Sequence, residues 1–332
     1  MMKNLLILGA TFLVASAVND LDEEWNIWKS NYGKQYSNKK EDSSRRQIWE
    51  ANWQKVQKHN RLAEQGLKNY TLGMNHFADK TVQELMPQKS LCYARQQETK
   101  TEMTPEPALA ASCETTKKNK FPKQVDWRES GCVTPVKNSG LLCESRWAFA
   151  TVSVLESRYC IKSKRLLTLS EQQLIDCDDN NSGCCGGNFN EAFEYVSHNG
   201  IMENKDYEYV QSQSQCFYKP KKAIKLNVNK YYKLSEEKEN IAKSVATDGP
   251  VAVKFDTSPE FFLYNGGIYD EECSYHGDFQ MAVVGYGSSC GTDYWILKNS
   301  WGKEWGEDGY ARIITQCITQ GSVAAVDIAE SA

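Results

Sequence analysis

Several patterns that would assign a function class are missing from this sequence of 332 residues. After residue 17, no apolar run is long enough to cross a bilayer as a helix. Lysine and arginine form no dense cluster, and the net charge is −4. The 12 cysteines show no zinc-ribbon spacing, since Cys184 and Cys185 are adjacent and Cys143 has no partner two residues away. We therefore expect no membrane span, no nucleic-acid partner, no metal and no cofactor.

The first residues have the pattern of a secretory signal peptide. Lys3 supplies a positive start, Leu5 to Val14 an apolar core, and Ala15-Ser16-Ala17 the small-x-small form of a cleavage site. A buried strand or helix is the alternative interpretation. We predict cleavage after Ala17 and a secreted or lysosomal protein. Abundant cysteine fits this route, because disulfides persist outside the cytosol.

The region from Leu21 to Leu67 has a helical period, with apolar residues at spacings near three and four. The identities within it are Glu41, Arg45, Ile48, Trp49, Asn52, Val56 and Asn60. They match the ERFNIN pattern of cathepsin L-type propeptides. The run Gly73-Met74-Asn75-His76-Phe77-Ala78-Asp79 resembles a second propeptide motif, Gly-x-Asn-x-Phe-x-Asp. An ordinary amphipathic hairpin would explain the period but not these identities.

The composition changes between about Pro87 and Lys120, where large apolar residues are few. Such a segment cannot bury enough surface to fold alone and is expected to be a linker. The next residues, Phe121 to Arg128, resemble the start of a mature papain-like enzyme. We therefore divide the chain into a signal peptide (1–17), a propeptide inhibitor-like domain (18–86), a linker (87–120) and a papain-like peptidase domain (121–332).

The last of these regions is helix-rich at its start and strand-rich at its end. A helix is predicted over Ala148 to Tyr159, and strands over Val228 to Tyr232, Val251 to Phe255, Met281 to Tyr286 and Tyr294 to Leu297. This order favours two packed lobes. The family resemblance implies the same α+β, papain-like two-lobe fold, in which a cleft separates a helical lobe from a β-barrel-like lobe.

The segment from Asn138 to Phe149 resembles the nucleophile loop of papain-like cysteine proteases. The family motif is Cys-Gly-Ser-Cys-Trp, and Arg146 stands where its second cysteine, the nucleophile, belongs. A guanidinium stays protonated and has no lone pair with which to attack a carbonyl carbon. It also brings positive charge to a helix N-terminus, where cations are disfavoured. We expect Glu144 to offset this charge by pairing with Arg146.

Two further site positions are replaced and one is retained. Counting back from Val284 to Gly287 places Phe279 at the family's histidine position, and phenylalanine cannot transfer a proton. Ser139 stands where the resemblance predicts the glutamine that helps to hold the oxyanion. Asn299 keeps the position of the asparagine that orients the histidine.

Histidine is scarce, and only His198 and His276 follow the nucleophile loop. His276 could take the histidine position if three residues were inserted after it. Three strand residues shift a side chain by roughly 10 Å and turn it to the other face, so this alignment needs both a gap and a bulge. We expect His198 to lie on the surface near a helix end.

The resemblance implies three disulfides, Cys143–Cys184, Cys177–Cys216 and Cys273–Cys317. Spacing alone does not fix them, because six cysteines allow 15 pairings. Pairing would remove Cys143 as a nucleophile, and a displaced catalytic thiol is the alternative. The cysteines left without an assignment are Cys92, Cys113, Cys132, Cys160, Cys185 and Cys290.

Part of a peptide-binding groove is retained in the sequence. Gly186 and Gly187 match family glycines that run beside a bound peptide, and by the same resemblance Phe189 would line the pocket for the second residue before the cut. The alternative is that the glycines only close a turn. Asn69 and Asn180 begin N-glycosylation sequons.

These observations predict a secreted, catalytically inactive homologue of a cathepsin L-like cysteine protease rather than an enzyme. It would be a monomer that binds peptides or cysteine proteases through its cleft or its prosegment. Two other hypotheses stay open. One is a propeptide-type inhibitor of cysteine proteases, and the other is an active cysteine endopeptidase with a rearranged site.

Overall fold

The computed structural model describes residues 21–85, 121–255, 257–271 and 279–329. The predicted signal peptide, the linker, Cys273 and His276 lie outside the described residues. A helix spans residues 21–31. The other helices are α2 (Lys39–Glu64), α3 (Val82–Leu85), α4 (Arg146–Ser163), α5 (Glu171–Cys177), α6 (Phe189–Asn199) and α7 (Lys238–Thr247). The strands are β1 (Tyr70–Leu72), β2 (Val125–Asp126), β3 (Val228–Leu234), β4 (Val251–Phe255), β5 (Tyr264–Tyr269), β6 (Phe279–Ser289), β7 (Thr292–Lys298), β8 (Tyr310–Ile314) and β9 (Ile318–Ile328).

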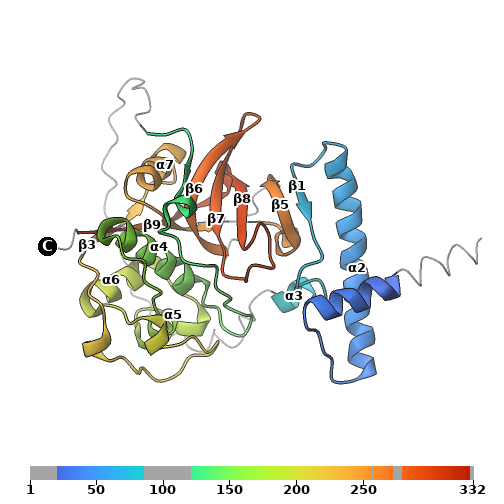
Figure 1. Cartoon of the computed structure of the whole chain (residues 1–332), viewed down its shortest axis with the longest axis horizontal. Helices are drawn as coiled ribbons and strands as arrows, with labels where there is room; N and C mark the ends of the chain where they lie inside the picture. Colours follow the sequence, from blue (N-terminus) through green and yellow to red (C-terminus); the bar gives the residue numbers. More distant parts are fainter. Residues whose placement is uncertain (1–20, 86–120, 256, 272–278, 330–332) are drawn as a thin grey trace, which may run out of the picture.

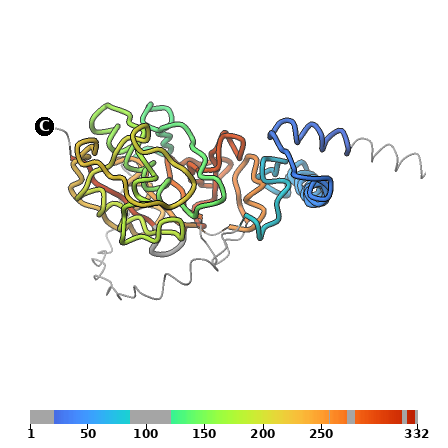
Figure 2. Tube along the Cα trace, turned by 90° about the horizontal axis from the view of Figure 1, so that it is seen from below, coloured from blue at the N-terminus to red at the C-terminus, as the bar shows by residue number. Residues whose placement is uncertain are grey.

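The N-terminal helices form a domain with its own tryptophan core. The helix over residues 21–31 crosses α2, and the ring of Trp25 lies 5.3 Å from that of Trp28 and 5.5 Å from that of Trp49. All three indoles are buried. In Figures 1 and 2 this domain stands beside the rest of the molecule rather than inside it. The predicted helical region is therefore confirmed.

The ERFNIN identities tie α2 to the second propeptide motif. The Asn52 amide donates to the backbone oxygen of Ala78 at 2.9 Å. The Asn60 amide both donates to the Leu72 oxygen and accepts from the Leu72 N–H, each at 2.9 Å. Asparagine at these positions therefore satisfies backbone groups at the end of β1 and in the irregular segment that follows it, which hydrophobic periodicity alone would not require.

The prosegment joins the remainder of the chain through a sheet edge. Strand β1 pairs antiparallel with β5, with Tyr70 opposite Gly267. Gly267 has φ +96°, and a Cβ there would lie 2.4 Å from the backbone oxygen of Asn69, so the close approach requires glycine. Nearby, the buried Asn75 amide donates to the Phe262 oxygen at 2.8 Å. Side-chain and backbone contacts therefore fix the same docking register.

Within the described residues the strands form one nine-stranded sheet, in the order β1-β5-β8-β7-β6-β4-β9-β3 with β2 paired to β6. Helices α4, α5 and α6 gather beside it as a second lobe (Figure 1), and α4 packs against β6, β9 and β4. Buried Arg158 of α4 ties the lobes together, since it donates to the backbone oxygens of Pro250 and Val326 at 2.7 Å each. The predicted two-lobe organisation is confirmed.

The predicted elements are found with small shifts at their ends. The helix expected from Ala148 is α4, and the four expected strands are β3, β4, β6 and β7. Exposed His198 lies in the last turn of α6, as expected. None of the described helices is both long and apolar enough to span a membrane.

His76 of the second propeptide motif is half-buried near the junction between prosegment and core, with its Nδ1 atom buried. Its ring lies 3.9 Å from that of Phe77 and 6.3 Å from that of Tyr32. Burial, reinforced by Lys34, lowers the pKa of His76 from 6.5 to about 4. A histidine held neutral in this way binds fewer protons in the folded than in the unfolded chain, so stability falls as the pH drops from 6.5 towards 4.

Replacing His76 by glutamine should remove this acid-dependent loss. We expect the free energy of unfolding of the full chain to drop less between pH 7 and pH 4.5 in His76→Gln than in the wild type, by about 2–3 kcal/mol. Urea unfolding at both pH values measures this difference. The exposed His198→Gln variant is the control and should behave as the wild type. Equal losses in wild type and His76→Gln would contradict the prediction.

Candidate functional site

Arg146, at the predicted nucleophile position, is the first residue of α4 and is buried. Its guanidinium pairs with the Glu144 carboxylate and lies 5.5 Å from the centre of the Phe279 ring. The expected Glu144 pair is therefore present, and the ring face adds a cation–π contact. Ser145, the N-cap, makes no side-chain capping bond. The carboxylate thus supplies the negative charge that this helix N-terminus favours.

Phe279, at the predicted histidine position, points into an aromatic cluster. It is 3% exposed, and its ring lies 5.4 Å from Phe262 and 5.7 Å from Trp301. Trp301 in turn meets the prosegment residue Phe77 edge to face at 5.4 Å. The structure therefore brings the two substituted positions together, and an apolar ring stands where proton transfer would require an imidazole.

Asn299 lies behind this cluster and is 3% exposed. Its Oδ1 accepts from the N–H of Ser300 at 2.7 Å, which fixes the orientation of the amide. Its Nδ2 is buried and has no hydrogen-bond partner among the described residues. The retained asparagine thus turns its acceptor to its own backbone and leaves its donor unused.

Ser139, at the predicted oxyanion position, is occupied by structural bonds. Its backbone N–H and its hydroxyl both donate to the Ser300 oxygen, at 2.8 and 2.9 Å. Its own oxygen accepts from the Tyr209 hydroxyl at 2.8 Å, and that hydroxyl also lies 2.7 Å from Ser145 Oγ. The Ser139 side chain is 1% exposed. It therefore holds the loop against Ser300 instead of presenting a donor to a ligand.

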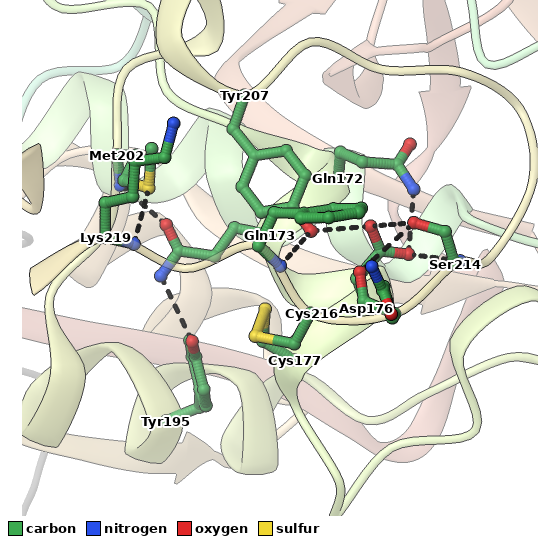
Figure 3. The surroundings of a disulfide bond; sticks show 12 residues. Gln172, Gln173, Asp176, Cys177, Tyr195, Met202, Tyr207, Ser214, Cys216 and Lys219 are labelled. Carbon is green, nitrogen blue, oxygen red and sulfur yellow. Dashed lines mark hydrogen bonds between the residues drawn. A yellow bond between two sulfur atoms is a disulfide. The ribbon is translucent and has the colours of Figure 1, made fainter.

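The segment that carries Tyr209 is anchored at the Cys177–Cys216 disulfide (Figure 3). Beside it, Asp176 accepts from the Tyr207 hydroxyl at 2.7 Å and from the Ser214 N–H at 2.7 Å. These bonds fix a long irregular connection on both sides of Tyr209. The disulfide therefore supports the predicted nucleophile loop from a distance.

The structure contains two of the disulfides that the resemblance implied, Cys143–Cys184 and Cys177–Cys216. Cys143 is accordingly no free thiol. Cys317 is disulfide-bonded, and its expected partner Cys273 lies outside the described residues. The sequence left six cysteines without an assigned partner. Of these, the structure pairs Cys132 with Cys160, shows Cys185 as disulfide-bonded, and leaves Cys290 free and exposed.

The predicted groove wall is tightly constrained at Gly187. A Cβ there would lie 2.5 Å from the Trp147 ring, so the residue must be glycine. Phe189 is 3% exposed, and Lys254 Nζ of β4 lies 6.0 Å from the centre of its ring. Sequence reasoning missed this lysine because only the fold brings the Lys254 side chain close to Phe189 at the start of α6. The wall therefore combines a buried aromatic ring with a cation.

The two sequons differ in their surroundings. The Asn69 amide donates to Asp270 at 2.6 Å, across the junction of prosegment and core. Asn180 is exposed, and its backbone N–H donates to Asp178 at 3.2 Å. Burial raises the pKa of Asp178 to about 6. Glycosylation of either asparagine stays a prediction.

A buried set of charges lies behind the site. Lys137 pairs with Glu156 at 3.0 Å and with Glu171 at 2.6 Å. Burial opposes the charge of Lys137, but the two carboxylates outweigh it and raise its pKa. Burial lowers the pKa of Lys298 to about 8, against the pull of Glu156. The sequence signal that could have revealed these buried charges was the presence of charged residues inside the otherwise apolar helix α4.

Among the described residues, no group of three His, Cys, Asp or Glu side chains is arranged to hold a metal ion.

Comparison with known proteins gives consistent matches over both parts of the chain. Residues 121–329 match the model of the papain family cysteine proteases, and residues 25–85 match the cathepsin propeptide inhibitor domain. Cathepsin S of Bos taurus is 39% identical over 300 residues, covering 88% of this chain and 87% of the relative. Procathepsin L of Rattus norvegicus is 38% identical and covers 93% of this chain and 91% of the relative. The structure of digestive procathepsin L 3 of Tenebrio molitor larval midgut superimposes with a TM-score of 0.78 at 33% identity, over 93% of this chain and 99% of that one.

Removing the Glu144 carboxylate should destabilise the fold. Glu144→Gln leaves the buried Arg146 guanidinium without its counter-charge at a helix N-terminus, which should cost about 3 kcal/mol of unfolding free energy. Urea unfolding at pH 7 measures this loss. The control is Glu203→Gln, which breaks an ion pair to a Lys205 side chain that is 70% exposed and should cost at most about 1 kcal/mol. Similar losses in both variants would contradict a special role for Glu144.

Proposed function

The chain belongs to the papain family of cysteine proteases and carries a cathepsin propeptide inhibitor domain, and from that premise we propose that it is a catalytically inactive, cathepsin L-like homologue. It acts by binding peptides or proteases, through its cleft or its prosegment. The observation that carries the proposal is the contact of buried Arg146 with Glu144 and Phe279. Arg146 cannot form a thioester with a substrate, and Phe279 cannot take a proton from a nucleophile.

The loss extends beyond the two substituted positions. The Ser139 hydroxyl donates to the Ser300 backbone oxygen and is not available to a ligand. Asn299 has no histidine to orient, because the buried ring of Phe279 occupies the predicted histidine position. Groups of a catalytic site act as a unit, and in one serine protease removal of the nucleophile or the base alone costs about 10⁶ in turnover. These replacements support inactivity rather than a slower enzyme.

We place the protein in the secretory pathway, secreted or lysosomal. Disulfides such as Cys143–Cys184 and Cys132–Cys160 support this, because they persist in oxidising compartments. The N-terminal signal pattern points the same way.

Binding through the cleft should favour peptides with an acidic anchor. Lys254 brings positive charge to the wall where Phe189 was predicted to line the second-residue pocket. A carboxylate in a partly desolvated site gains more from a cation than an apolar side chain does.

A prosegment inhibitor of active relatives is the second candidate function. It is favoured by the docking of β1 onto β5 and of Phe77 onto Trp301.

Restoring the chemistry tests the main proposal. The wild-type full chain should neither cleave a fluorogenic peptide nor react with an active-site epoxide, and should not process itself in mild acid. The double variant Arg146→Cys with Phe279→His should gain activity of at least about 10²-fold over background, because nucleophile and base return together. Arg146→Cys alone is the matched control and should stay near background. Cleavage or self-processing by the wild type would refute inactivity.

Inhibition is tested by adding the full chain to an active cathepsin L-like protease. If its prosegment domain competes for the active enzyme, the rate of peptide hydrolysis should fall in proportion to the added chain. Phe77 packs on Trp301 in this chain, and if the prosegment docks on the active enzyme in the same way, replacing Phe77 by alanine should weaken the inhibition. An unchanged rate at excess of the full chain would rule out this candidate.

Peptide binding is tested by isothermal titration of the full chain with peptides that differ only in one anchor residue. A glutamate peptide should bind about 5–10-fold more tightly than its leucine counterpart, and Lys254→Ala should abolish the difference. The conservative Lys254→Arg variant should preserve it. Absence of heat with every peptide would exclude a peptide-binding cleft.

A further inference from the structure

A small polar cavity lies between the lobes, behind the wall formed by the start of β6. Its volume is ≈ 20 Å³, counted as the space open to the centre of a water-sized sphere. Side chains of both lobes line it, including Ser153 of α4, Glu171 of α5, Gln280 of β6, and Lys298 and Asn299 from the end of β7. None of the three substituted positions, Arg146, Phe279 and Ser139, lines it.

Three polar atoms in the cavity lining are buried without a hydrogen-bond partner among the described residues. They are Ser153 Oγ, Glu171 Oε2 and Asn299 Nδ2. Their side chains belong to residues that are 6%, 1% and 3% exposed. Each such atom would cost about 1–3 kcal/mol if nothing satisfied it. Three of them around one cavity therefore indicate a ligand rather than three separate defects.

The donor and acceptor types define that ligand. Glu171 Oε2 needs a donor, and Asn299 Nδ2 needs an acceptor because Asn299 Oδ1 is already fixed by Ser300. Ser153 Oγ can take either role. An anion would face the carboxylates of Glu156 and Glu171, and a metal cation would face Lys137 and Lys298. A neutral ligand that donates and accepts fits all of them.

The size of the cavity points to the same ligand. A buried water needs about 10–15 Å³ of this kind of space and two to four polar partners. We propose that the cavity binds one water molecule, which links Asn299 of the strand lobe to Glu171 and Ser153 of the helical lobe. In this chain Asn299 Nδ2 then holds a water between the lobes, which gives this donor a partner although there is no histidine to orient. The inference is independent of peptide binding or inhibition.

A crystal structure of the full chain at about 1.5 Å resolution tests the proposal directly. The expected result is an ordered water within about 2.7–3.2 Å of Asn299 Nδ2 and of Glu171 Oε2 or Ser153 Oγ. A dry cavity would overturn the proposal. So would a cavity that neighbouring side chains have filled, with direct bonds between the three groups.

A matched pair of variants on one helix gives a second test. Ser153→Ala removes one partner of the water and should lower the melting temperature by about 2–4 °C. Ser157, one turn further along α4, is also buried, and its hydroxyl has no hydrogen-bond partner in the part of the chain that the structure describes, but it does not line the cavity. Ser157→Ala should therefore leave the melting temperature unchanged or raise it. Equal shifts in the two variants would count against a bound water at Ser153.

Discussion

The burial of aromatic rings around Trp301 connects the prosegment, the strand lobe and the candidate site. Trp301 stacks on Phe262 at 5.0 Å, meets Trp305 at 5.1 Å, and receives Phe77 of the prosegment and Phe279 of β6 on its remaining sides. Rings of this size dominate the energy of a core, and offset or edge contacts add to it. Prosegment docking, sheet packing and the substituted site thus share one cluster. Phenylalanine at position 279 suits that cluster better than a polar imidazole would.

The Arg146 charge is the main electrostatic problem that follows from this arrangement. A buried guanidinium at a helix N-terminus opposes the helix dipole, and its Nε has no partner among the described residues. Glu144 compensates the Arg146 charge with a carboxylate, and Phe279 adds a cation–π contact through the face of its ring. The three residues depend on one another, so replacing one of them would leave the other two with unfavourable contacts.

Much of the fold and part of the site followed from local sequence. The hydrophobic period predicted a helix over this region, and the structure shows what two of its ERFNIN asparagines do: Asn52 and Asn60 bond to the chain in and just before the second motif. Counting back from the run Val284 to Gly287 placed Phe279 at the histidine position that the resemblance implies, and the structure puts its ring 5.5 Å from the Arg146 guanidinium. Other contacts depend on tertiary packing alone. Nothing in the spacing of Cys132 and Cys160, or of Lys254 and Phe189, reveals that the fold brings each pair together. The cavity groups come from three separate elements and share no motif.

The pairing of β1 with β5 has a consequence for the behaviour of the protein in solution. In the sheet order, β1 is the terminal strand next to β5, so it covers backbone groups that would otherwise form an open edge. Open edges recruit strands of other chains and promote aggregation. An active protease gains a working cleft when its prosegment leaves. Release of the prosegment from this chain would uncover the β5 edge, so the docked prosegment also protects that edge against self-association.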